Sequence, residues 1–475
     1  MVLGTIADTL TRGVEQVSDT FSQTFMEPTL RLGVTGLARA GKTVFITSLV
    51  ANLLDRARMP QLVAEREGRI LTTFLQPQPD DTVPRFDYES HLAELTGTDP
   101  RWPDSTRAIS ELRLSLKVRP TGLLSGLSGP RTLHLDIVDY PGEWLLDLGL
   151  MDKSFAQWSE TMLTRMTRWP DHAGFAALAT SEAAQADLDE PVAKRLASAW
   201  TALLHAARGA GFSDCAPGRF LLPGDLDGSP VLTFAPLPPQ DGAGRRSLYR
   251  EFERRFEAYK AKVVKPFFRD HFARIDRQIV LVDALGAIHS GPKAVEDLRQ
   301  TLADILGAFR PGQNAFLSQL LLGKRVEKIL FAATKADHLH HTQHARLSAI
   351  MEALTRDARD RARFAGAETQ ALSLAALRAT TEQMVSHGGR DLACVRGALL
   401  QADGSRGKQA AFYPGELPED PSHLLTPARQ GADRWLDTDY EVMRFAPAPV
   451  TLKPGEGPPH IRLDRAAQFL IGDRL

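Results

Sequence analysis

Eight consecutive residues near the N-terminus have the types and spacing of a phosphate-binding loop. Residues 36–43 read GLARAGKT, which fits the pattern GxxxxGK[ST]. In such a loop the glycines let backbone N–H groups turn toward phosphate oxygens, the lysine places a cation beside the terminal phosphates, and the threonine hydroxyl binds Mg²⁺. The expected phosphate-contacting residues are Gly36, Arg39, Ala40, Gly41, Lys42, Thr43 and Val44.

The residues on both sides of this loop predict the elements that would position it. Residues 30–35, LRLGVT, have the composition of a short buried strand, and residues 44–54 have the apolar spacing of an amphipathic helix. A strand, a glycine-rich loop and a helix in this order place phosphate groups at the positive end of the helix dipole. The sequence therefore predicts a nucleotide-binding site here.

A second motif, DYPG at residues 139–142, follows two predicted strands. Apolar residues alternate with polar ones over 112–118 and again over 133–137, which predicts an antiparallel pair with one buried face. An aspartate at a strand end beside a phosphate loop can hold Mg²⁺, usually through water, so we assign this role to Asp139. The backbone N–H of Gly142 is then the candidate donor to the γ-phosphate.

A second DxxG pattern begins at Asp283 and competes for the magnesium role. We rank Asp283 below Asp139, because the Pro-Gly turn of the earlier motif is tighter and because a predicted strand pair leads into it. The plainer interpretation is that Asp283 caps the helix expected to start near Pro292.

A third motif, TKAD at residues 334–337, follows a predicted strand over 328–333. The carboxylate of Asp337 can accept hydrogen bonds from the N1–H and 2-amino groups of guanine, and adenine has no donors at those positions. The aliphatic stem of Lys335 can cover one face of the base. Together with Thr334, these residues predict selectivity for a guanine nucleotide, GTP or GDP.

A last predicted strand over 370–374 leads into a loop of small residues, AALR. Small side chains there would let a backbone N–H, from Ala376 or Leu377, reach the guanine carbonyl oxygen. With the three motifs above, this loop completes the expected nucleotide site.

The chain is long enough for more than one domain and has an ordinary globular composition. It has 475 residues, of which 43% are hydrophobic and 24% charged, and its net charge is −1. Without a global basic field, nucleic acid is not an expected partner. The two cysteines, Cys215 and Cys394, have neither zinc-site nor disulfide-framework spacing, which suits a reducing cytoplasm.

The N-terminal residues have neither a secretion signal nor an apolar run of membrane-spanning length. Residues 5–26 instead carry apolar side chains at roughly helical spacing. We expect a helix packed on the nucleotide domain, and docking to a membrane surface or to a partner is the alternative.

The predicted fold class is α/β, with a mixed sheet flanked by helices as in P-loop nucleotide-binding domains. The expected parts are an N-terminal helix, a discontinuous nucleotide-binding domain, a mostly helical insertion and a small C-terminal appendage, at residues 1–28, 29–145 with 278–385, 146–277, and 386–475 respectively. Within the insertion only 219–222 and 231–234 have strand character. The appendage ends in a short segment with an apolar face, which predicts a docked helix.

Four histidines, His338, His340, His341 and His344, cluster after the TKAD motif. A metal site would need their side chains to converge, together with a chemical reason for a metal. The more ordinary interpretation, which we adopt as the expectation, is a solvated helix start.

The ordered set of motifs resembles that of translation-factor-related GTPases of the P-loop superfamily. Longer strings look like those of one family, the YcjX-like stress proteins of proteobacteria; they lie at residues 36–43, 102–106, 109–114, 139–145 and 459–464. The resemblance spans nearly the whole chain. It implies a protein that binds GTP and GDP and has a helical insertion after DxxG. It also implies a stress-response setting close to the phage-shock system and a membrane-protein neighbour in the same operon.

Position within that family pattern makes Thr106 the candidate switch threonine. Its hydroxyl would bind Mg²⁺ together with Thr43 and Asp139, from a loop that folds over the γ-phosphate. Ser105 is the runner-up, and a polar residue at a strand start is the plainer interpretation of either position.

The residue after DxxG departs from the pattern of many relatives, which have Gln or His there to orient the attacking water. This chain has Glu143. A carboxylate could act as a base but would repel the γ-phosphate, so slow intrinsic hydrolysis is expected. Arg39 could offset phosphate charge as a built-in arginine finger, although a side chain that faces solvent or pairs with a carboxylate is the more ordinary expectation. The expected catalytic residues are Lys42, Thr106, Glu143 and Arg39.

Two hypotheses of different class follow from these motifs, with the stress-response setting and the membrane-associated partner taken from what the resemblance implies. The first is a Mg²⁺-dependent GTPase that hydrolyses GTP slowly and acts as a cytoplasmic molecular switch in a stress response. The second is a nucleotide-gated interaction module with negligible hydrolysis. It would present its insertion to a membrane-associated protein partner and lie peripherally at the inner membrane. An ATP-dependent kinase is a weaker third interpretation, because the TKAD motif argues against adenine.

Overall fold

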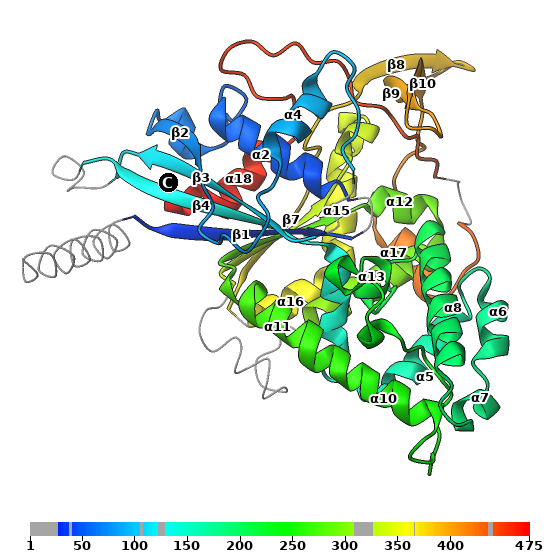
Figure 1. Cartoon of the computed structure of the whole chain (residues 1–475). Helices are drawn as coiled ribbons and strands as arrows, with labels where there is room; N and C mark the ends of the chain where they lie inside the picture. Colours follow the sequence, from blue (N-terminus) through cyan, green and yellow to red (C-terminus); the bar gives the residue numbers. More distant parts are fainter. Residues whose placement is uncertain are drawn as a thin grey trace, which may run out of the picture.

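The centre of the molecule is a seven-stranded sheet with helices on both faces (Figure 1). The computed structural model describes residues 27–37, 40–104, 108–121, 129–307, 326–364, 366–435 and 440–475. The strand order is β2-β3-β4-β1-β5-β6-β7. The strands are β1 (Thr29–Gly36), β2 (Ile70–Gln76), β3 (Ser110–Val118), β4 (Arg131–Asp139), β5 (Arg277–Val282), β6 (Lys328–Ala333) and β7 (Glu368–Ser373).

Five neighbouring strands, from β4 through β1, β5 and β6 to β7, run parallel, and β2 and β3 are antiparallel additions at one edge. Parallel strands are covered on both faces, so their residues form nearly continuous buried runs. All residues of β5 are buried, and all of β6 except its first. This mixed sheet flanked by helices confirms the predicted fold class, a P-loop GTPase-like fold.

The predicted antiparallel pair is confirmed as β3 and β4, in which Leu112 lies opposite Ile137 and Leu114 opposite Leu135. The expected single buried face was wrong, because helices cover both faces of the sheet and every residue of β4 from Leu133 to Asp139 is buried. The strand β2, which pairs with the outer side of β3, was not predicted. Only Ile70, its first residue, is buried, because β2 is the edge strand of the sheet. An edge strand with mostly uncovered side chains lacks the apolar alternation that identifies a strand in sequence.

The C-terminal ends of the five parallel strands lie at the same edge of the sheet, because the strands share one direction. The loops that leave this edge carry each of the predicted motifs, after β1, β4, β6 and β7. Asp283 follows β5 at the same edge. The topology therefore brings together motifs that are far apart along the chain.

Two hydrophobic cores cover the two faces of the sheet, and successive strand residues alternate between them. Leu330 of β6 belongs to the core shared with α2 and α18, whereas Phe331 belongs to the core on the opposite face. The helices of the two faces are α2 (Lys42–Leu54) and α18 (Leu463–Ile471) on the first, and α12 (Ala284–His289), α13 (Pro292–Gly307) and α15 (His344–Leu354) on the second. Three further helices are α3 (Val63–Arg66), α4 (Tyr88–Thr96) and α16 (Arg356–Phe364).

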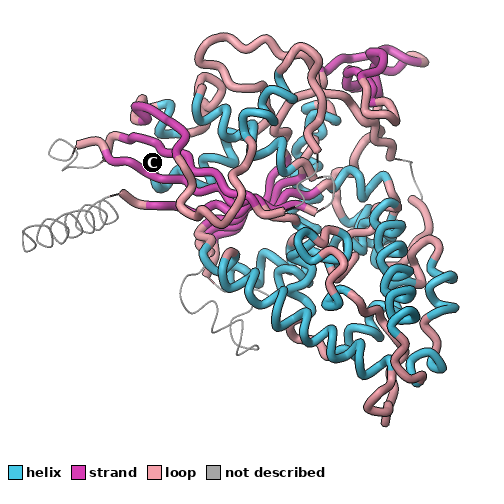
Figure 2. The backbone as a smooth tube through the Cα atoms, viewed as in Figure 1, coloured by secondary structure: helices cyan, strands magenta, loops and turns pink. Residues whose placement is uncertain are grey.

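The segment between β4 and β5 is described throughout and contains helices without any strand, grouped apart from the sheet in Figure 2. Its elements are η1 (Gly142–Leu150), α5 (Phe155–Met166), α6 (His172–Leu178), α7 (Ser181–Gln185), α8 (Glu190–Gly209), α9 (Gly218–Leu221), η2 (Gly224–Leu226), η3 (Pro230–Leu232), α10 (Leu248–Tyr259), η4 (Lys260–Val264), α11 (Lys265–Asp270) and η5 (Phe272–Arg274). Its centre is aromatic: the rings of Trp158 and Phe256 stack at 5.1 Å, and Trp200 meets Trp158 edge-on at 6.4 Å.

The strand character expected at 219–222 and 231–234 was wrong, because these residues lie largely in the short helices α9 and η3. Both helices start beside a proline, at Pro217 and Pro230. Proline fits the first turn of a helix, and a short apolar run does not by itself separate helix from strand.

The residues after β7 first form a small antiparallel sheet and then return to the main sheet. The small sheet has the order β10-β9-β8, with β8 (Thr381–His387), β9 (Arg390–Leu400) and β10 (Arg406–Phe412), and it projects from one corner of the molecule in Figure 1. The helix α17 (Ser422–Arg429) follows and packs on α13. The last helix, α18, buries Leu463, Ala466 and Leu470 in the α2 core. Among the described residues, no helix combines the length and apolarity that a membrane crossing needs.

Candidate functional site

The loop after β1 ends in a backbone conformation that favours glycine. Gly41 has φ 79°, in the left-handed region, and directly precedes α2. The N–H of Phe45 donates to the carbonyl of Gly41 at 2.9 Å, so the loop passes at once into the first helical turn. Lys42, Thr43 and Val44 therefore form the N-terminus of α2, where backbone N–H groups favour an anion.

The helix α2 is fixed from behind by buried polar contacts. The hydroxyl of Thr47 donates to the carbonyl of Thr43 at 2.8 Å. The amide of Asn52, which is fully buried, donates to Ser48 O at 2.9 Å and to Pro458 O at 3.0 Å. The C-terminal segment is thus bonded to the helix that carries the phosphate-binding loop.

The glycine of the DYPG motif lies directly against this loop. A Cβ atom on Gly142 would overlap the backbone carbonyl of Gly36. No other residue type fits this backbone-to-backbone approach without movement. Asp139 ends β4 next to β1, opposite Val34, and is 1% exposed. Strand pairing therefore places the DxxG carboxylate and glycine beside the phosphate-binding loop.

The residue after the motif, Glu143, is tied to the helical insertion. Its carboxylate Oε1 lies 2.6 Å from Nη2 of Arg208, near the end of α8, and its side chain is 6% exposed. The insertion also packs on its backbone, since a Cβ on Gly218 would overlap the carbonyl of Glu143. The side chain expected to meet the attacking water is therefore held by an arginine of the insertion.

The rest of η1 extends this contact. The guanidinium of Arg219 lies 3.2 Å from the ring centre of Trp144, a cation–π contact. Asp147 accepts a hydrogen bond from Gly218 N at 2.8 Å and from the hydroxyl of Tyr259 at 2.5 Å. Burial raises the pKa of Asp147 to about 7, against the lowering effect of these two hydrogen bonds.

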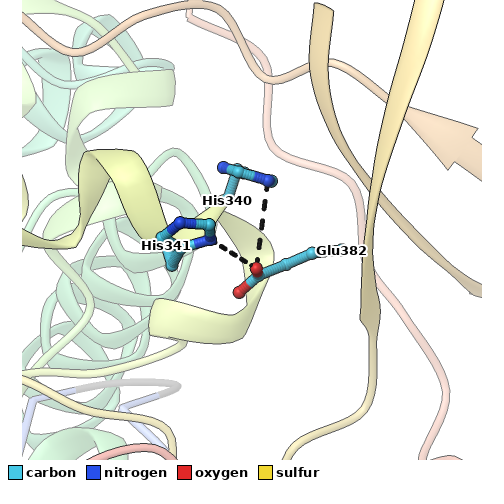
Figure 3. A group of neighbouring side chains, drawn as sticks. All are labelled: His340, His341 and Glu382. Carbon is cyan, nitrogen blue, oxygen red and sulfur yellow. Dashed lines mark hydrogen bonds and ion pairs between the residues drawn. The ribbon is translucent and has the colours of Figure 1, made fainter.

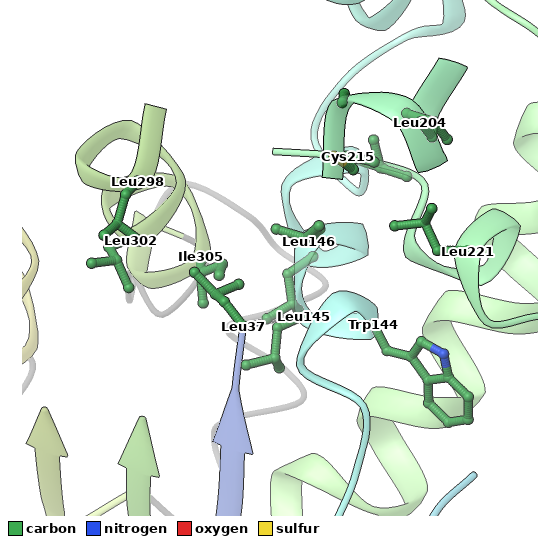
Figure 4. Packing of buried hydrophobic residues seen from close by; sticks show 14 of the residues in the cluster. Leu37, Trp144, Leu145, Leu146, Leu204, Cys215, Leu221, Leu298, Leu302 and Ile305 are labelled. Atoms are coloured by element: carbon green, nitrogen blue, oxygen red, sulfur yellow. The ribbon is translucent and has the colours of Figure 1, made fainter. Parts of the chain in front are cut away.

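Apolar side chains join the phosphate-binding loop, η1, the insertion and α13 in one core (Figure 4). Leu37 follows the first glycine of the loop and belongs to the same cluster as Leu145 and Leu146 of η1. Leu204 of α8 and Leu298 of α13 complete the path. The loop, η1, the insertion and α13 therefore share one close-packed core.

The TKAD motif occupies the loop after β6, as predicted from its position after a strand. Lys335 has φ 60° in the left-handed region, and its ammonium pairs with the carboxylate of Asp283. Asp283 also caps a helix by accepting from Gly286 N at 3.0 Å. The capped helix is α12, which starts at Ala284, so the expected cap on the helix near Pro292 was wrong: an Asp caps the helix whose first turn immediately follows it.

The predicted guanine-reading carboxylate is buried and anchored. Asp337 is 4% exposed, and its Oδ2 accepts a hydrogen bond from Ala379 N at 2.9 Å. The hydroxyl of Thr380 donates to the backbone carbonyl of Asp337. Both partners precede β8, so the small sheet begins where this loop is held. Thr334, the first residue of the motif, is also buried.

The loop after β7, which contains Ala376 and Leu377, lies beside the TKAD loop. Leu374, at its start, accepts a hydrogen bond from Ala336 N at 3.1 Å. The C-terminal segment supports the other side, because Arg378 N donates to Pro459 O at 2.8 Å. The two loops assigned to the base are thus in contact and backed by residues from the end of the chain.

The expectation of a solvated helix start was wrong for two of the four histidines. His344 is buried, and its Nε2 bonds Ala336 O at 2.8 Å, which supports the TKAD loop. His340 is buried as well, at 7% exposure. His341 is exposed, and His338 packs edge-on against Phe445 with ring centres 5.2 Å apart. The polarity of histidine hides burial from sequence reasoning, because its ring packs and bonds equally well inside a protein.

Three predicted site residues lie outside the described part of the chain. Arg39, Thr106 and its alternative Ser105 fall there, so their expected roles at the phosphates and at Mg²⁺ stay predictions. The N-terminal helix expected over 5–26 also falls outside.

The structure adds site residues that sequence reasoning missed, namely Arg208, Gly218 and Ala379. Each contacts a motif residue from another element of the fold. No local pattern marks them, because an arginine at a helix end and a glycine after proline are common in any globular chain. Only the packing of the insertion and of the small sheet identifies them.

Comparison with known proteins identifies a family and relatives that match nearly the whole chain. The model of the YcjX-like family, DUF463, matches residues 30–475. A protein of Escherichia coli (strain K12) named "Ras-like GTPase YcjX" is 40% identical over 462 residues, covering 94% of this chain and 96% of the relative. A Shewanella oneidensis protein of the same name is 37% identical over 472 residues, covering 94% of each.

Proposed function

The chain belongs to the YcjX-like family, and from this premise we propose that it binds GTP and GDP and slowly hydrolyses GTP with Mg²⁺. The observation that carries the proposal is the meeting of three motifs at one sheet edge: the GxxxxGKT loop, DYPG and TKAD. Each supplies a different part of the chemistry. A phosphate loop alone would support many nucleotide enzymes.

The magnesium site is proposed at Thr43 and Asp139. A hydroxyl and a carboxylate are the hard oxygen donors that Mg²⁺ prefers, and both residues are buried, Thr43 in the first turn of α2 and Asp139 at the end of β4. When bound, the ion would neutralise charge on the β- and γ-phosphates. Lys42, at the N-terminus of α2, adds a second positive charge on the same phosphates.

The proposed base selectivity rests on Asp337. Its Oδ2 is fixed by Ala379 N, so the carboxylate has a set orientation before a base arrives. A buried carboxylate favours a base with two donors on one edge and disfavours adenine, which has no donors at those positions. Lys335 and the loop of Ala376 and Leu377 complete the pocket proposed for guanine.

Slow hydrolysis is proposed from the position of Glu143. Its carboxylate is held by Arg208 and is therefore not free to orient a water molecule. In addition, the negative charge of Glu143, placed near the negatively charged γ-phosphate, would raise the barrier to GTP hydrolysis. Faster turnover would require η1 to release this pair.

The insertion is proposed as the element that responds to the nucleotide. The N–H of Gly142 would bind the γ-phosphate of GTP and lose that contact in GDP. Gly142 begins η1, whose next residues contact Arg208, Gly218 and Tyr259 of the insertion. A shift of η1 on hydrolysis would therefore move the insertion.

A second candidate function keeps nucleotide binding but lets hydrolysis become negligible, so that the insertion docks a partner only in one nucleotide state. The Glu143–Arg208 pair favours it, because the pair disables the position that orients water in many relatives. The membrane-associated partner and the stress-response setting stay predictions from the resemblance.

The test of the proposed function is phosphate release by the full chain. Lys42→Ala removes the proposed phosphate cation, and turnover of GTP should fall by at least about 100-fold. Lys408→Ala, at an exposed position of β10, is the matched control and should leave turnover unchanged. Equal turnover in the wild type and Lys42→Ala would overturn the proposal. Measurable GTP binding without phosphate release would favour the second candidate.

A further inference from the structure

Three side chains that carry metal-binding atoms converge beside the TKAD loop (Figure 3). His341 Nδ1 lies 2.6 Å from Oε2 of Glu382, and His340 Nε2 lies 3.9 Å from the same oxygen. All the ligand atoms of this His340–His341–Glu382 cluster lie within 4.8 Å of one another. Two imidazoles therefore approach one carboxylate oxygen from different sides.

A hydrogen bond accounts for only part of this cluster. His341 and Glu382 are joined by an ordinary hydrogen-bonded pair at 2.6 Å. The ring of His340 is buried, yet its Nε2 is directed at the same carboxylate from 3.9 Å, which is too far for a hydrogen bond. The two imidazole rings also lie close together, with centres 4.3 Å apart. A metal ion between the two imidazoles and the carboxylate would be coordinated by all three groups.

We propose that His340, His341 and Glu382 form a site for a divalent transition-metal ion, with Zn²⁺ as the reference ion. Zinc bonds of about 2.0–2.2 Å in tetrahedral geometry place neighbouring ligand atoms roughly 3.4 Å apart. On metal binding, the 2.6 Å distance from His341 Nδ1 to Glu382 Oε2 would lengthen, and the 3.9 Å distance from His340 Nε2 to the same oxygen would shorten. His341, whose side chain is 64% exposed, has the freedom to make this adjustment.

The surroundings of His340 suit a metal ligand. Its Nδ1 lies 3.0 Å from the hydroxyl of Thr342, and the backbone N–H of Thr342 donates to the same nitrogen at 3.5 Å. In the tautomer that binds a metal through Nε2, Nδ1–H donates to the hydroxyl in place of the long contact with the backbone N–H, and the lone pair of Nε2 is directed toward Glu382. A hydrogen bond on the second ring nitrogen fixes the orientation and tautomer of metal-binding histidines in the same way. Arg378 contacts the other carboxylate oxygen of Glu382 at 3.5 Å and leaves Oε2 to the imidazoles.

The donor set indicates which ions the site would take. Two imidazole nitrogens and one carboxylate oxygen suit Zn²⁺, Co²⁺ or Ni²⁺, whereas Mg²⁺ prefers oxygen donors alone. Three protein ligands leave a fourth position for water. The site is therefore chemically distinct from the magnesium site proposed at Thr43 and Asp139.

The location of the site predicts a link to the base-reading loop. His340 and His341 follow Asp337 within a few residues, and Glu382 follows Ala379 and Thr380, which already bond Asp337. A metal ion would cross-link these same two segments a second time. If the bound ion tightens the loop that holds Asp337, the ion raises the affinity of the protein for nucleotide. Thermodynamic linkage then requires that bound nucleotide raises the affinity for the ion by the same factor.

The experiment titrates the nucleotide-free full chain, with any purification tag removed, with Zn²⁺ by calorimetry and with Co²⁺ by visible absorption. We expect one ion per chain at micromolar or lower dissociation constant. Glu382→Gln and His341→Ala, both at partly or fully exposed positions, should abolish stoichiometric binding without unfolding the chain. His387→Ala, at the exposed far end of β8, is the matched control and should bind like the wild type.

Thr342→Val tests the proposed orientation of His340. It should weaken metal binding about 10- to 100-fold, because it removes the hydroxyl that would accept from Nδ1–H and keeps all three ligands. The proposal is overturned if the wild type binds no stoichiometric Zn²⁺, or if Glu382→Gln and His341→Ala bind as tightly as the wild type. These readouts involve no nucleotide, so they are independent of GTP binding or hydrolysis.

Discussion

Glu143, directly after the DxxG motif, forms an ion pair with Arg208 of the helical insertion, with 2.6 Å between Oε1 and Nη2. The pair joins the strand end beside the phosphate-binding loop to the insertion. Breaking a buried pair leaves one charge without compensation, which costs about 3–5 kcal/mol when both groups are fully buried. Arg208 is 24% exposed, so the cost here is smaller. The pair therefore ties η1 to the insertion, at less than the cost of a fully buried pair.

The first prediction concerns the charge of Glu143. Glu143→Gln removes the negative charge and keeps an oxygen that can accept from Arg208, while the amide can orient water. GTP turnover should rise about tenfold, or about 1.4 kcal/mol in barrier height. Phosphate release measures it, with Glu160→Gln at an exposed position of α5 as control. Unchanged turnover with unchanged GTP affinity would show that Glu143 does not limit hydrolysis.

The second prediction concerns the close approach of Gly142 to Gly36. In Gly142→Ala the added Cβ overlaps the Gly36 carbonyl, so the start of η1 must move away. Affinity for a GTP analogue should fall about 10- to 100-fold, the value of one hydrogen bond to a charged group, while GDP affinity stays nearly constant. Gly149→Ala is the matched control in the same helix, because a Cβ there meets open space. An equal loss for both nucleotides would point to a damaged loop instead.

The third prediction concerns base selectivity. Asp337→Asn replaces an acceptor that faces the guanine donors with a donor, so the preference for GTP over ATP should fall at least about 100-fold. Xanthosine triphosphate has a carbonyl in place of the 2-amino group, and its affinity should rise. Competition binding measures the preference for GTP over ATP and the affinity for xanthosine triphosphate. A gain in the affinity for xanthosine triphosphate shows that the variant is folded. A variant that still discriminates GTP from ATP like the wild type would refute the assignment of Asp337.

The fourth prediction is a pH dependence carried by Asp147. Burial raises the pKa of Asp147 in the folded protein to about 7, well above its ordinary value. The folded state therefore holds a proton that the unfolded state has lost, and stability falls as pH rises from about 4 to about 7. At about 1.4 kcal/mol per pKa unit, the full change is up to about 4 kcal/mol.

Urea unfolding from pH 5 to 8 measures this dependence. Asp147→Asn cannot ionise, so its stability relative to the wild type should improve steadily as pH rises to about 7. Burial also raises the pKa of Asp297 to about 6. Asp297 is present in both proteins, so its effect on stability cancels in the difference between their free energies of unfolding. A difference between wild type and variant that is constant with pH would contradict the assignment.

The sequence predicts the phosphate-binding part of the site, because the elements that form it are neighbours along the chain. The strand β1, the loop ending at Gly41 and the helix α2 are consecutive, and each has its own pattern. Asp139 was assigned above Asp283 from the strand pair leading into it, and this ranking stays a prediction, because β4 and β5 both pair with β1. The carboxylate of Asp283, which follows β5, pairs with Lys335.

The rest could not be predicted, because it depends on contacts between distant segments. Arg208 meets Glu143 only because the insertion folds back onto η1. Arg277 begins β5 with a side chain only 1% exposed, and its guanidinium donates to Leu470 O and Asp473 near the end of the chain. Edge strand β2 has too few covered side chains for an apolar pattern.

The most direct test of the account is calorimetric binding of GTP, GDP and ATP to the full chain, with and without Mg²⁺, followed by phosphate release from the same sample. The account predicts that GTP and GDP bind and ATP does not, that Mg²⁺ strengthens GTP binding, and that phosphate release is slow. Equal affinities for ATP and GTP, or an affinity for GTP that does not change when Mg²⁺ is added, would contradict the account.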